Sequence, residues 1–213
     1  MKKLFLFLFL FSSKLNAQQA YLDIGKSTTK FIYDDSKGAR LKNLEPTSHS
    51  YMAVGYRNRL FNAKKLKGLV GIRYSGYGAY GSDKTLGNIY KWDLNLIELN
   101  LGLEYKIMNI KRASLFVKEI STIEYVIQGT QTINNKIYNL KGIEEFNKPM
   151  FDFKLGIGFL QPLSEKVSFY VQYSAGTSLA GSNNPEKLRM VSKNITFGLI
   201  AYSINSIRRK IKD

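Results

Sequence analysis

The sequence contains no cysteine and a single histidine, His49. The absence of cysteine excludes a disulfide framework, a thiolate zinc site and a cysteine nucleophile. One histidine among scattered carboxylates does not form a metal ligand set, so we expect neither a metal nor another cofactor. Stability must therefore come from burial and strand pairing.

Long apolar runs are also missing, except at the start. Leu4 to Phe11 is unbroken and apolar, follows Lys2 and Lys3, and gives way to small and polar residues up to Ala17. The run is shorter than the roughly 20 residues that a membrane-spanning helix needs, and it has the pattern of a secretory signal peptide cleaved near Ala17. We expect three parts: a signal peptide (1–17), a single domain (18–204) and a basic tail (205–213).

Acidic residues are scarce, with 16 against 32 basic ones. Loss of Lys2, Lys3 and Lys14 with the signal peptide leaves 29 basic residues and a balance of +13. Such a chain favours anionic neighbours. For an exported protein these are outer-membrane lipid and the phosphates of lipopolysaccharide. The alternative, a basic cytosolic protein that binds nucleic acid, is disfavoured by export.

From Gln18 onward the apolar residues recur with period two, and β-branched and aromatic types dominate, which is typical of strands. In 151–159, for example, odd positions are large and apolar while even positions are polar or glycine. The same test predicts eight strands. They cover residues 20–33, 48–60, 66–75, 90–107, 113–128, 150–160, 167–176 and 190–204.

The connections between these strands alternate in length. Short ones are expected at 61–65, 108–112 and 161–166, and long ones at 34–47, 76–89, 129–149 and 177–189. Outer-membrane barrels place short turns in the periplasm and long loops outside. We therefore predict an all-β fold, an eight-stranded antiparallel up-and-down transmembrane β-barrel with both termini in the periplasm.

Two strands do not fit a simple alternation. In the fourth, Trp92, Leu94 and Leu96 are at even positions, whereas Leu99 and Leu101 are at odd ones. A β-bulge near Ile97 would place all of them on one face. The fifth strand, 113–128, has mixed parity, and its register is left open.

Glycine indicates which face is inside, because a water-exposed strand gains nothing from it. In a narrow eight-stranded barrel, small residues make room for long charged ones. The alternative, a soluble lipocalin-like barrel, would turn its apolar face inward. Glycine shares the polar face at Gly55, Gly71, Gly102, Gly156, Gly158 and Gly198. The opposite, lipid-facing set is Leu22, Ile24, Met52, Val54, Val70, Ile72, Leu99, Leu101, Phe153, Leu155, Phe169, Val171, Phe197 and Leu199, with interfacial aromatics at Tyr56, Tyr74, Tyr105, Phe159 and Tyr173.

Ionised residues on the polar face need partners of opposite charge once they are buried. We expect them to form a salt-bridged plug without a wide water channel. The predicted lumen network comprises Asp23, Arg57, Arg73, Glu98, Glu104, Asp152 and Lys154.

The run Leu96 to Lys106, aliphatic–Glu–aliphatic and ending in Tyr105-Lys106, resembles the fourth strand of the small outer-membrane β-barrel family of the Bacteroidota often called PorT-like. The resemblance extends over essentially the whole mature chain. It implies an outer-membrane barrel, and some relatives are accessory parts of secretion and gliding machinery.

Three smaller features are candidate sites. His49 lies between Ser48 and Ser50, but adjacent residues of a strand point to opposite faces, so we expect a polar histidine near a loop and not a catalytic base. Tyr77 and Tyr80 lie in a Gly/Tyr-rich loop tip that could bind glycan or protein. The candidate periplasmic docking residues are Lys64, Lys65, Arg208, Arg209 and Lys210.

We therefore predict a non-enzymatic outer-membrane barrel that acts as a structural or accessory scaffold, with a periplasmic or outer-membrane protein as partner. Two alternatives stay open. One is a barrel enzyme that modifies lipid A or phospholipid, and the other is a narrow solute pore.

Overall fold

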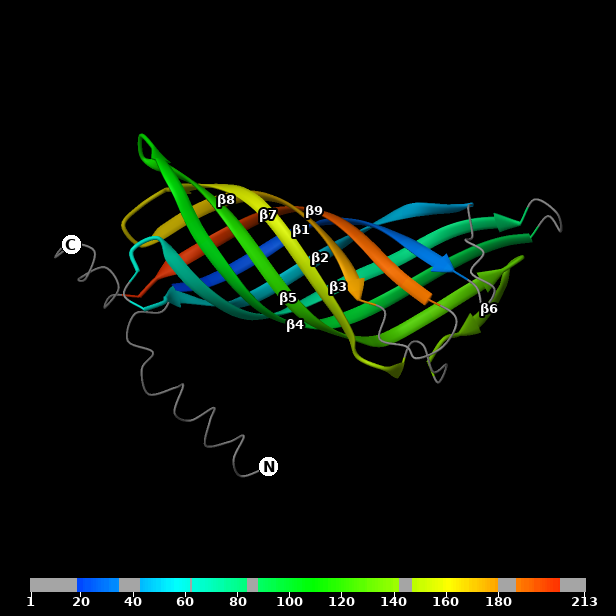
Figure 1. Ribbon diagram of the computed structural model, residues 1–213. Helices are drawn as coiled ribbons and strands as arrows, with labels where there is room; N and C mark the ends of the chain where they lie inside the picture. Colours follow the sequence, from blue (N-terminus) through cyan, green and yellow to red (C-terminus); the bar gives the residue numbers. More distant parts are fainter. Residues whose placement is uncertain are drawn as a thin grey trace, which may run out of the picture.

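The computed structural model describes residues 19–34, 43–61, 63–83, 88–141, 147–179 and 187–203. Antiparallel strands form one sheet that closes on itself as a barrel (Figure 1). The strands are β1 (Gln19–Asp34), β2 (Leu44–Arg59), β3 (Leu66–Asp83), β4 (Asn88–Ile110), β5 (Ala113–Ile133), β6 (Lys136–Asn139), β7 (Met150–Pro162), β8 (Val167–Leu179) and β9 (Lys187–Tyr202).

Eight of these strands form the barrel wall. Each pairs with its neighbours along the chain, except that β5 is followed in the wall by β7, and β1 pairs with β9 to close the ring. β6 has only four residues and pairs with β5 alone, through a turn in which Asn134 and Asn135 both have positive φ. The predicted fold class, an eight-stranded antiparallel barrel, is confirmed. Within the described ranges no helix is long and apolar enough to span a membrane.

The signal peptide and the basic tail both lie outside the described residues, so those two parts of the predicted domain division stay predictions. The N-terminus of β1 and the C-terminus of β9 are paired, Gln19 with Tyr202. The β2–β3, β4–β5 and β7–β8 turns lie at this same end of the barrel, hereafter the short-turn end (Figure 1). The strand ends that border the connections expected to be long lie at the other, hereafter the long-connection end.

Alternation along each strand separates an apolar exterior from a packed interior. On β4, for example, Leu101 is 61% exposed and Glu104 only 3%. Of the predicted lipid-facing residues, all but Phe169 are at least 38% exposed on the outer face, and Phe169 is half-buried because its ring stacks against Phe197. The outer surface between the two ends is thus predominantly apolar, and we call it the apolar band.

The predicted loop 76–89 was wrong, because β3 and β4 remain paired far beyond its start. Their register runs without a shift from Leu66 opposite Tyr105 to Asp83 opposite Asn88. Only four residues, 84–87, separate the two strands. Alternating glycine and tyrosine, which we took for a loop tip, therefore forms part of the barrel wall.

The predicted bulge near Ile97 was also wrong. Leu94 and Leu96 stay on the inner face together with Glu98, and β4 keeps its alternation through this stretch. The register shift lies on the neighbouring strand, where Ile127 of β5 is an extra residue between the pairs Asn95–Gln128 and Leu96–Val126. The mixed parity of β5 has another cause: the apolar Phe116 and Ile120 lie on the inner face together with Lys118 and Thr122.

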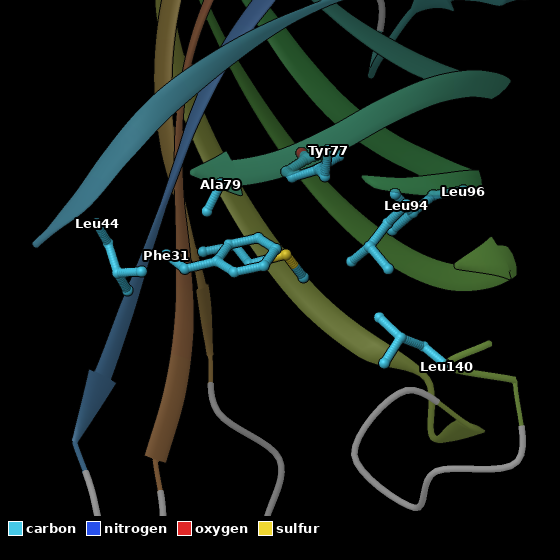
Figure 2. Close-up of a cluster of buried hydrophobic side chains, with 8 residues drawn as sticks. Phe31, Leu44, Tyr77, Ala79, Leu94, Leu96 and Leu140 are labelled. Atoms are coloured by element: carbon cyan, nitrogen blue, oxygen red, sulfur yellow. The ribbon is translucent and has the colours of Figure 1, made fainter. Parts of the chain in front are cut away.

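The interior has three layers along the barrel axis. At the long-connection end, Phe31, Leu44, Tyr77, Ala79, Leu94, Leu96, Leu140 and Met190 form an apolar cluster (Figure 2). At the short-turn end, a second cluster contains Tyr21, Phe116, Leu160, Tyr170 and Ile200. Most of the charged interior side chains lie between the two clusters. Because the lumen is apolar at both ends, an even-numbered leucine on β4 is as well buried inside as a glutamate in the middle.

The β4–β5 hairpin extends past its neighbour at the short-turn end (Figure 1). The last β3–β4 pair joins Leu66 and Tyr105, whereas β4 continues to Ile110. Lys111, with a φ of 55°, makes the tight turn into β5. The edge of β4 from 107 to 110 therefore has no strand partner on the β3 side within the described residues.

Candidate functional site

Lys154 of β7 is the centre of a buried ion-pair group in the middle layer. Its Nζ lies 2.6 Å from Asp152 Oδ2, 3.1 Å from Glu124 Oε1 and 3.2 Å from Glu98 Oε2. Arg73 of β3 approaches Glu98 from the other side, with Nε 3.4 Å from Oε1. Three carboxylates on β4, β5 and β7 thus share two cations, and all five side chains are buried.

A second ion pair lies nearer the short turns. Arg57 of β2 donates to both carboxylate oxygens of Glu104 on β4, at 2.8 and 2.9 Å, and to Gln19 at 2.7 Å. Lys67 Nζ is 3.6 Å from the same carboxylate. Both oxygens of Glu104 accept from the same nitrogen, Nη1, while Nη2 has no hydrogen-bond partner. Charge-assisted hydrogen bonds of this kind are stronger than those between neutral groups.

Asp23 is buried in the lumen, as predicted, but its hydrogen-bond partner is a tyrosine and not a cation. The hydroxyl of Tyr170 on β8 donates to Asp23 Oδ1. Lys118 Nζ lies 3.4 Å from the same hydroxyl and 4.6 Å from the centre of the Tyr170 ring. Tyrosine thus connects an acid and a base that have no direct ion pair among the described residues.

The structure therefore places all seven residues of the predicted network inside the barrel, each at most 9% exposed. Six of them lie in the two ion-pair groups. Sequence reasoning missed Glu124 and Lys118 of β5, which are also buried. Their even parity, shared with Thr122, was the available signal, but the uncertain register of this strand hid it.

Lumen glycines make room mainly for aromatic rings and not, as we had expected, for long charged chains. A Cβ at Gly198 would lie 2.2 Å from the Tyr170 ring, and one at Gly158 would lie 2.2 Å from Phe116 Cζ. At Gly71 it would lie 2.1 Å from Tyr21 Oη. Rings and charges together leave an interior cavity of about 30 Å³, which is room for only one or two water molecules.

His49 is a packing residue in the wall. A Cβ on Gly76 would come within 2.8 Å of its Nδ1, and one on Gly78 within 2.9 Å of its Nε2. Nε2 also lies 3.0 Å from Thr47 Oγ1. The nearby Ser48 hydroxyl is paired with Thr28, at 2.9 Å on the outside of the barrel. His49 and the Ser48 hydroxyl therefore do not form a nucleophile–base pair.

The predicted Gly/Tyr loop site does not exist in the structure. Tyr77 is 1% exposed, belongs to the apolar cluster and donates to Glu124 Oε1 at 3.2 Å, whereas Tyr80 is 40% exposed on the outer face. Residues on opposite faces of one strand cannot stack on the same ligand. Of the docking residues, Lys64 and Lys65 are exposed in the β2–β3 turn, while Arg208, Arg209 and Lys210 lie outside the described residues.

A closed ring of eight tilted strands with an apolar outside and a charged, plugged inside is the fold of the small outer-membrane β-barrel proteins. Neisserial surface protein A (NspA) matches with a TM-score of 0.50 and 12% identity, over 86% of this chain and 97% of its own. The outer-membrane protein OprG from Pseudomonas aeruginosa matches with a TM-score of 0.50 and 13% identity, over 88% and 96%. At these identities the likeness shows the fold alone. No protein-family model matches the sequence, and neither does any curated protein.

Proposed function

We propose that this chain spans an outer membrane as a plugged barrel and acts there as a non-enzymatic scaffold. The observation that carries the proposal is the polarity of the wall. Apolar side chains such as Ile24, Val54 and Leu155 are 50 to 57% exposed outside, while Lys154 and Glu98 are at most 1% exposed inside. A surrounding of hydrocarbon stabilises this arrangement. Pairing of β1 with β9 closes the ring, so neither terminal strand is left with a free edge.

The packed interior disfavours the solute-pore alternative. A channel needs a continuous aqueous path, whereas the lumen here has an apolar cluster at each end and ion pairs between them. Single-channel recording of the purified protein in planar bilayers tests this point. We expect no discrete conductance, and steps typical of an open pore would refute the scaffold proposal in favour of a pore.

A face suited to a protein partner lies at the short-turn end. The overhanging β4–β5 hairpin exposes Ile107, Met108 and Ile110, and its turn carries Lys111 and Arg112. An unpaired strand edge can accept a further strand from another chain. Apolar side chains beside basic ones favour a partner with an acidic, partly apolar segment.

Copurification from envelopes tests this docking face. Lys111→Glu and Arg112→Glu, together with Lys64→Glu and Lys65→Glu, should remove copurifying proteins while the barrel still folds. The matched control is charge reversal at four exposed basic residues of the opposite end, Lys91, Lys136, Lys141 and Arg189. An unchanged set of partners in the turn variant would contradict docking at this end.

Two further parts of the proposal rest on the sequence. Export with cleavage near Ala17 is supported by the pattern of residues 1–17. Membership of the PorT-like class, with a role as a secretion accessory, is supported by the resemblance of the run from Leu96 to Lys106. The enzyme alternative is disfavoured by the packing of His49 against Gly76 and Gly78, and a lipid-hydrolysis assay with His49→Ala tests it.

A further inference from the structure

Three lysines interrupt the apolar exterior on one side of the barrel. Lys26 and Lys30 of β1 and Lys193 of β9 are all exposed and share the outward face of the β9–β1–β2 region. No carboxylate of the described residues forms an ion pair with any of them. Lys193 lies diagonal to both lysines of β1 across the strand pair. Because all three charges are positive and have no counter-charge in the described part of the chain, the patch favours an anion from outside.

The register places the three cations around a pair of hydroxyl groups. Thr28 lies opposite Lys193 on β9 and opposite Ser48 on β2, with Lys26 and Lys30 two residues to either side along β1. Thr28 Oγ1 and Ser48 Oγ are hydrogen-bonded at 2.9 Å and exposed. Ammonium and hydroxyl donors in one small area are the groups that bind phosphate oxygens.

The surroundings of the patch indicate what carries the phosphate. Below it, toward the middle of the barrel, the outward residues are apolar, with Ile24 on β1 and Ile195 and Phe197 on β9. Ala175 of β8 lies beside Lys193 of β9, and its small side chain does not project far from the wall. An apolar wall near the middle of the barrel, with a cluster of cations nearer its end, matches an amphiphile with acyl chains and a phosphorylated headgroup. The patch lies toward the long-connection end, which the proposed orientation places in the outer leaflet.

We propose that Lys26, Lys30 and Lys193 (hereafter the lysine patch) bind the phosphate groups of a glycolipid of the lipid A class, whose acyl chains lie along Ile24, Ile195 and Phe197. This inference rests on the proposed membrane-spanning function. It adds a specific lipid site to a protein that would otherwise only be surrounded by lipid. The headgroup sugar would cover the hydroxyls of Thr28 and Ser48 and the low surface at Ala175.

The test compares the wild-type chain with Lys26→Ser/Lys30→Ser/Lys193→Ser in phosphatidylcholine vesicles that contain diphosphoryl lipid A, phosphatidylglycerol or neither. Lipid binding is measured by energy transfer from Trp92, the single tryptophan, to dansyl-labelled lipid in the vesicles. Basic side chains near anionic lipid contribute about 1 kcal/mol each, so we expect the triple variant to bind lipid A about a hundredfold more weakly. The triple Lys→Arg variant should retain most of the binding, because it keeps the charges.

The matched control is Lys64→Ser/Lys65→Ser/Lys166→Ser, which removes the same charge from the short turns and should bind lipid A like the wild type. Equal weakening in both triple variants would overturn the site, and so would equal binding of phosphatidylglycerol, which would assign the lysine patch to any anionic lipid. Binding of an acidic protein but not lipid A would overturn it in favour of a protein interface. Failure of the wild type to insert into phosphatidylcholine alone would instead contradict the proposed function.

Discussion

At the scale of single residues, Lys154 is the cation that compensates most of the buried negative charge in the lumen. Its ammonium contacts Glu98, Glu124 and Asp152 at once, and all four side chains are buried. Removing one member of a buried charged group leaves the others desolvated and without compensation, which costs more than the pair itself contributes.

We therefore predict that Lys154→Met lowers the free energy of unfolding by about 3 to 5 kcal/mol. The measurement is urea unfolding in phosphatidylcholine vesicles, followed by Trp92 fluorescence. Lys64→Met, at an exposed turn, is the control and should change stability by less than about 0.5 kcal/mol. A loss equally small for Lys154→Met would mean that the interior is hydrated.

Gly158 tests the role of glycine in the lumen. An added methyl group would overlap the Phe116 ring, which itself packs edge-on against Tyr170 at 5.8 Å. Gly158→Ala should cost about 1 to 3 kcal/mol by overpacking. Combining it with Phe116→Leu should recover part of that loss, which a double-mutant cycle measures. Additive losses would show that ring contact does not explain this glycine.

At the scale of the elements, period-two alternation was enough to predict eight strands, their antiparallel order and the end at which the turns are short. The pattern is reliable where an apolar outside meets a charged inside, as at Leu99, Leu101 and Glu104. The strand ends were predicted less well. β3 continues past its expected end because Tyr77 and Ala79 pack into the interior, a burial that local composition does not reveal.

The part of β4 near the long-connection end shows why the parity of apolar residues alone misled the prediction. Leu94 and Leu96 are fully buried in the apolar cluster (Figure 2), yet they look like lipid-facing residues in the sequence. Polarity separates lumen from lipid only where the lumen is polar. The same limit applies to Glu124, because the apolar Phe116 and Ile120 share its inner face on β5 and obscure the alternation.

Truncation of leucines on β4 distinguishes the two faces directly. Leu94→Ala should destabilise the barrel by about 2 to 5 kcal/mol, because it opens a cavity in a packed cluster. Leu101→Ala, on the same strand but in contact with lipid, should cost far less, since acyl chains fill the space. The readout is again urea unfolding in vesicles. Equal effects would support the bulge near Ile97 that the structure contradicts.

At the scale of the whole molecule, the apolar band governs behaviour outside the membrane. Side chains such as Met52, Leu101 and Phe197 are 46 to 61% exposed over the wall, an extent that soluble monomers rarely present in one contiguous area. We predict that the mature chain is monodisperse in detergent and aggregates when detergent is removed, as measured by light scattering. A stable monomer in plain buffer would contradict the membrane assignment.

The seam between β1 and β9 bears on how the barrel is completed. Several interior contacts join the first strands to the last: Asp23 to Tyr170, Arg73 to Asn194 at 3.0 Å, and Tyr51 to Thr196. A chain that lacks its final strand would hold ionised groups against hydrocarbon with no means of compensation. Insertion and closure must therefore occur together, and a nascent barrel would remain at the membrane surface until its C-terminal strand has arrived.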